Sequence, residues 1–100
     1  MDQVKVLEDQ LDLLVKDQEN RMLIEKKFFT EVIDSIVDVS LSLMRYDVDK
    51  NKIRQVLERQ LEILIDGQEV YVKSNEKTNL CIVSEIVRIV RVLNMLDNTK

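Results

Sequence analysis

The chain has 100 residues, of which 45% are hydrophobic and 34% are charged, and its formal net charge is −4. A chain of this length is expected to form one domain, residues 1–100, and an acidic chain without a concentrated basic face is a poor ligand for phosphate, so we expect no nucleic-acid partner. No apolar run reaches the length of a signal peptide or a membrane span, which favours a cytoplasmic protein without a membrane partner.

Residues 1–46 are predicted to form one long N-terminal helix. They contain neither glycine nor proline, and one heptad frame runs through them without a slip, with 10 of its 13 a and d positions apolar. Such a frame is typical of a coiled-coil seam. Two collinear helices are an alternative. The polar stretch Lys16–Arg21 is the weakest part of the pattern, and a turn there would fold the helix back and give a four-helix monomer.

A second, shorter helix is predicted over residues 50–66. Asp49 or Asn51 can cap its start by accepting hydrogen bonds from free backbone N–H groups. Its end is predicted at Asp66 and Gly67, because glycine readily takes the left-handed conformation that often follows a helix.

A third helix is predicted over residues 79–96, where isoleucine and leucine recur every three or four positions. The segment is rich in β-branched residues, which favour strands. A short β-hairpin around residues 69–84, pairing 69–73 with 80–84, is therefore the competing interpretation.

The apolar stripe of the long helix predicts self-association. A helix of about 45 residues is about 65 Å long, so two shorter helices can cover only part of it. The uncovered apolar part needs a partner, and the simplest partner is a second copy of the chain. The residues expected to make this contact are Val4, Leu7, Leu11, Leu14, Val15, Met22 and Phe29. The residues expected to form the core of the resulting dimeric helical bundle are Val32, Ile36, Leu43, Ile53, Leu57, Leu61, Leu64, Ile82, Ile86, Ile89 and Leu93.

The residue types of the chain give little support for a catalytic site. The chain has no histidine, so it has neither a histidine base nor a histidine-bearing zinc site. The one cysteine, Cys81, lies in an apolar run and is expected to be buried and unreactive. We expect no enzymatic activity, no cofactor and no small-molecule substrate.

The segment Asp47–Glu58 resembles a calcium-binding EF-hand loop, with oxygen ligands at loop positions one, three, five and twelve. Lys52 stands where that loop needs glycine, and Arg54 stands where it needs an apolar residue. A polar turn followed by a helix cap explains the same residues. A calcium-binding module is therefore kept as the second alternative function.

Three segments within residues 1–72 carry a family likeness: Lys27-Phe-Phe-Thr-Glu-Val-Ile-Asp-Ser-Ile36, Gln55-Val-Leu-Glu-Arg-Gln-Leu-Glu-Ile-Leu64 and the closing Gly67-Gln-Glu-Val70. Together they resemble the short nucleotide exchange factors of the GrpE family. That resemblance implies a long dimerising helix that leads into a helical bundle, and nucleotide exchange on a DnaK-type chaperone. The family's β-domain, which touches the chaperone, has no counterpart in residues 73–100, and no functional residue carries over.

The sequence thus favours an all-α, non-enzymatic protein–protein interaction module that self-associates through its N-terminal helix and binds a second protein. It would act as an adaptor, a regulator or a small acidic chaperone-like protein. A GrpE-like exchange factor is the first alternative.

Overall fold

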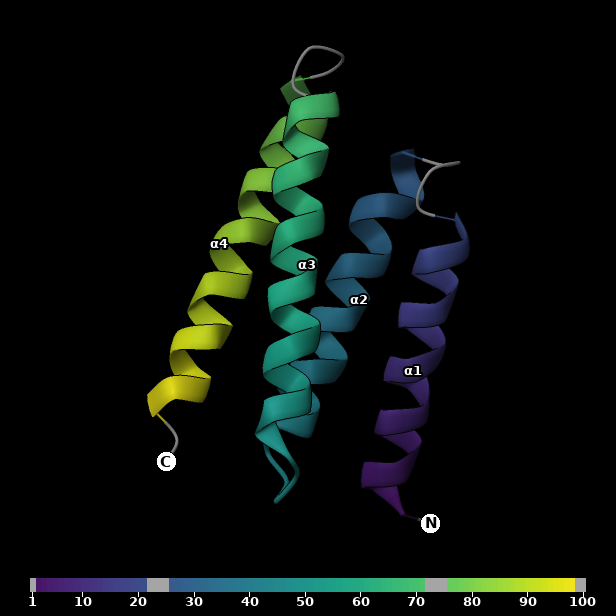
Figure 1. Ribbon diagram of the computed structural model, residues 1–100, viewed down its shortest axis with the longest axis vertical. Coiled ribbons are helices and arrows are strands. Elements are labelled where there is room, and N and C mark those ends of the chain that lie inside the picture. Colours follow the sequence, from purple (N-terminus) through teal and green to yellow (C-terminus); the bar gives the residue numbers. More distant parts are fainter. Residues whose placement is uncertain (1, 22–25, 72–75, 99–100) are drawn as a thin grey trace. The chain divides into compact units, whose positions relative to one another are not determined.

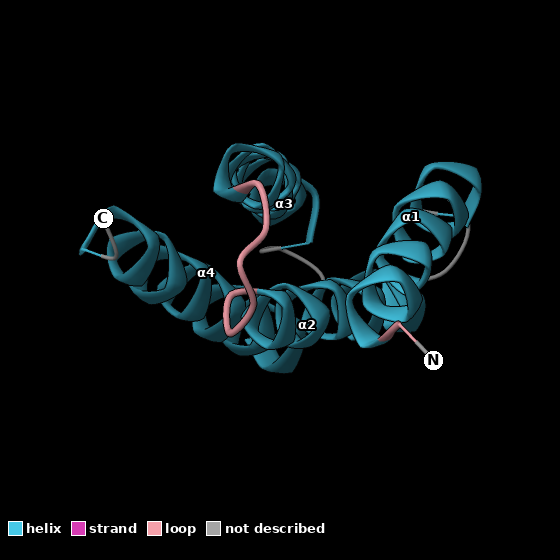
Figure 2. Cartoon of the chain, turned by 90° about the horizontal axis from the view of Figure 1, so that it is seen from below, coloured by secondary structure: helices cyan, strands magenta, loops and turns pink. Residues whose placement is uncertain are grey.

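The computed structural model describes residues 2–21, 26–71 and 76–98, and the side chains of residues 2–19, 30–68 and 80–98. Four helices run through these ranges: α1 (Gln3–Arg21), α2 (Lys26–Leu43), α3 (Lys50–Tyr71) and α4 (Glu76–Asn98) (Figure 1). No strand occurs in the described part of the chain (Figure 2). The prediction of an all-α fold is confirmed.

The chain divides into two compact units, Met1–Asp49 and Lys50–Lys100. In the first unit α1 packs against α2, and in the second α3 packs against α4. Each unit is a hairpin of two consecutive antiparallel helices (Figure 1). The prediction that residues 1–100 act as one domain stays a prediction.

The first hairpin corrects the prediction of one long helix over residues 1–46. The hydroxyl of Tyr46 donates a hydrogen bond to Oε1 of Gln3 over 2.7 Å, which a continuous helix cannot allow. α1 ends at Arg21 and α2 begins at Lys26, and residues 22–25 lie outside the described part. The polar stretch Lys16–Arg21 belongs to α1, so it is not the turn. Folding back lets the stripes of α1 and α2 bury each other, which is more favourable than leaving them in water.

The ends of the first hairpin are held by local hydrogen bonds. Asp2 caps α1, because its Oδ1 accepts the backbone N–H groups of Val4 and Lys5 at 3.1 and 3.3 Å. After α2 the backbone tightens into a turn, in which the N–H of Tyr46 donates to the carbonyl of Leu43 over 3.0 Å.

The second hairpin corrects two predicted boundaries. α3 continues past residue 66 to Tyr71, so Gly67 lies inside the helix and does not end it. No glycine in the described residues has a positive φ. α4 begins at Glu76 and not at residue 79. A glycine inside a helix costs about 0.5–1 kcal/mol relative to alanine, a cost that the packing of α3 against α4 can offset.

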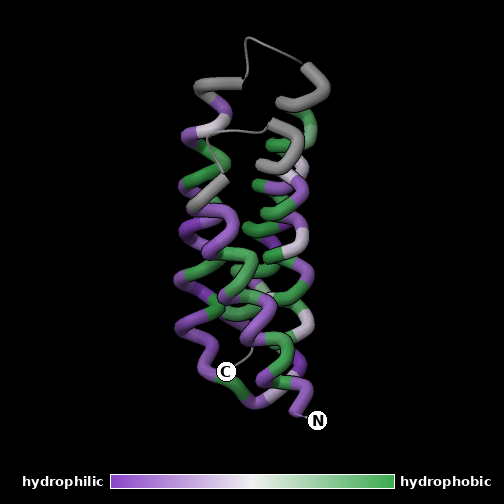
Figure 3. Tube along the Cα trace, turned by 90° about the vertical axis from the view of Figure 1, so that its right-hand side faces the viewer, coloured by the Kyte–Doolittle hydropathy of each residue, from purple (hydrophilic) through white to green (hydrophobic). Residues whose placement is uncertain are grey.

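The alternative β-hairpin around residues 69–84 is wrong. Residues 69–71 end α3, residues 76–84 belong to α4, and residues 72–75 lie outside the described part. β-Branched residues favour strands only weakly, and the three- and four-residue spacing of the apolar positions decides in favour of a helix. Figure 3 shows hydrophobic and hydrophilic residues alternating along the helices, as amphipathic faces require.

Candidate functional site: inner and outer helix faces

The stripe of α1 that was predicted to mediate self-association is turned into the first hairpin. Leu11 is only 1% exposed, while Val4, Leu7, Leu14 and Val15 are half-buried. Met22 lies outside the described residues, and so does the side chain of Phe29. The argument for an uncovered stripe depended on a continuous helix, and the fold-back removes that premise.

Most of the residues predicted to form the core lie in the interior. Leu61, Ile86 and Leu93 are half-buried. The buried ones are Val32, Ile36, Leu43, Ile53, Leu57, Leu64, Ile82 and Ile89.

Besides Leu11, which was assigned to the self-association contact, the sequence-based list of core residues omitted five buried side chains: Ile33, Val37, Ile63, Val92 and Leu96. The heptad frame, which covers residues 1–46, left out Ile33 and Val37 because its a and d positions describe a narrow seam. A helix of a globular protein buries a wider stripe. The sequence could have identified Ile33 and Val37 as core residues, because each directly follows a residue that was predicted to be buried, Val32 or Ile36.

Three polar residues share the interior with these apolar side chains. Gln18 is 2% exposed, Ser40 is fully buried and Gln60 is 1% exposed. Ser40 Oγ donates to the carbonyl of Ile36 over 2.8 Å, so its hydroxyl is satisfied within α2. Gln18 and Gln60 also have interaction partners. Buried polar groups need such partners, since an unsatisfied one costs about 1–3 kcal/mol.

α4 presents a second apolar face to solvent. The side chains are Leu80, Val83, Val87 and Val90, with exposed fractions of 68%, 40%, 42% and 42%. Their spacing of three, four and three residues places them on one side of the helix. We call these four residues the α4 outer stripe. The inner face of α4 carries Ile82, Ile89, Val92 and Leu96.

The inner side of α4 also takes in polar groups. The side chain of Glu85 is 14% exposed and that of Arg88 is 32% exposed, and the two form an ion pair over 4.0 Å. The helix therefore turns a carboxylate toward the interior while three valines of the outer stripe face water. Burying apolar area is favourable and burying charge is costly. With the carboxylate turned inward and the valines outward, α4 keeps an apolar surface that a further contact can cover.

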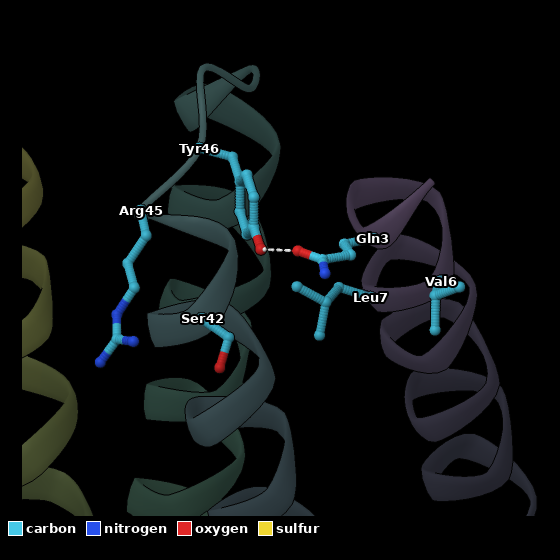
Figure 4. Close-up of a pocket in the computed structure, with 6 residues that line it drawn as sticks. All are labelled: Gln3, Val6, Leu7, Ser42, Arg45 and Tyr46. Atoms are coloured by element: carbon cyan, nitrogen blue, oxygen red, sulfur yellow. Dashed lines mark hydrogen bonds between the residues drawn. The ribbon is translucent and has the colours of Figure 1, made fainter. Parts of the chain in front are cut away.

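An open cavity of about 370 Å³ lies at one end of the first hairpin. Gln3 and Leu7 of α1 and Tyr46 face one another across it, whereas Arg45 points away from them (Figure 4). The hydroxyl of Tyr46 is bonded to Gln3, and that of Ser42 donates to the carbonyl of Asp38 over 3.0 Å. The hydroxyl groups of Tyr46 and Ser42 thus already donate hydrogen bonds within the hairpin. The cavity therefore belongs to the contact between α1 and the end of α2.

The segment Asp47–Glu58 does not form a twelve-residue loop. α3 begins at Lys50, so residues 50–58 are its first turns. The ligand positions of an EF-hand loop depend on a looped backbone, and this geometry gives the calcium alternative no support. The described residues hold no group of three or more cysteine, aspartate or glutamate side chains arranged to bind a metal ion.

Cys81 is exposed on α4, so the prediction of a buried thiol is wrong. Its apolar sequence neighbours, Leu80 and Ile82, are on different sides of the helix, and Ile82 alone is buried. Successive helical positions are 100° apart, so an apolar run in the sequence does not place all its members inside.

Comparison of the chain with known protein families, with curated proteins and with solved structures gave no match. The likeness to GrpE-type exchange factors therefore stays a prediction from the helix pattern. None of the described helices combines the length and the apolar character that crossing a bilayer requires.

Proposed function

We propose that this protein is a non-enzymatic, helical protein–protein interaction module that associates with itself and presents a surface for other proteins. The observation that carries the proposal is the α4 outer stripe, in which Leu80 is 68% exposed and the three valines are each 40–42% exposed. Contiguous apolar patches on a small folded domain mark interaction sites, because covering them removes apolar area from water.

The geometry of the stripe suits a helical partner. Its residues follow the three- and four-residue spacing with which packed helices interlock. Such a module fits the role of an adaptor, a regulator or a small chaperone-like protein, since each of these acts by holding another chain.

Self-association is tested by multi-angle light scattering on a size-exclusion column. The chain mass is 11.8 kDa, and we expect at least twice that mass at micromolar concentration, with dissociation on dilution. A monomer at several hundred micromolar would contradict the proposal.

A further inference from the structure

We draw no further inference here: the strongest candidate, the exposed apolar face of α4 that carries Leu80, Val83, Val87 and Val90, belongs to the surface already described, and nothing in the structure shows what covers it.

Discussion

Asp2 illustrates how a single side chain sets a helix boundary. The first N–H groups of a helix have no partner within it, and here two of them, those of Val4 and Lys5, donate to the Asp2 carboxylate. We expect Asp2→Ala to lower the free energy of unfolding by about 1 kcal/mol, whereas Asp2→Asn keeps an equivalent acceptor and should change it little. Urea denaturation of the three proteins measures this. Equal losses for Ala and Asn would show that charge, and not capping, is the source of the stabilisation.

Burial distinguishes apolar residues that look alike in the sequence. Ile36 is fully buried in α2, whereas Leu13 is 59% exposed on α1. Ile36→Ala should cost about 2–5 kcal/mol through lost burial and the cavity that it leaves. Leu13→Ala should stay within about 0.5 kcal/mol of the wild type. Chemical denaturation followed by circular dichroism compares the two, and similar losses would mean that α1 packs with a different face inward.

At the scale of helices, the apolar periodicity predicted the helices and most inward-facing residues but not where the chain folds back. A heptad frame keeps its phase whether a helix continues or reverses. The four residues between α1 and α2, Met22-Leu-Ile-Glu25, include none of the residues that usually mark turns. Gly67 misled the prediction in the opposite way, because it looked like the end of a helix but lies inside α3. Packing outweighs the small cost of glycine in helix propensity.

The candidate interaction surface could be predicted only in part. The sequence shows both apolar rows of α4, the isoleucines and the valines. Which row is buried depends on how α4 rotates against α3, and no local preference encodes that rotation. The structure decides it by burying Ile82 and Ile89 and leaving Val83 and Val87 partly exposed.

The fold-back of α1 onto α2 can be measured directly. Spin labels at positions 5 and 45, introduced as cysteines in a Cys81→Ser chain, should be separated by little more than the 8–10 Å between packed helices plus the label linkers. One continuous helix would place them about 60 Å apart. Electron–electron resonance on labelled chains diluted with unlabelled ones gives the intramolecular distance. A distance near the long value would restore the single N-terminal helix.

For the molecule as a whole, the pairing of each helix with its neighbour along the chain has a kinetic consequence. α1 packs against α2 and α3 against α4, so only short connections must close before apolar area is buried. Chains with such local contacts fold in microseconds to milliseconds. The sequence also contains no proline, which removes the slow isomerisation that delays many refolding reactions. Stopped-flow refolding should thus show fast, concentration-independent formation of the hairpins. A later phase whose rate rises with protein concentration would report the meeting of two chains, and Val87→Asp should abolish that phase alone.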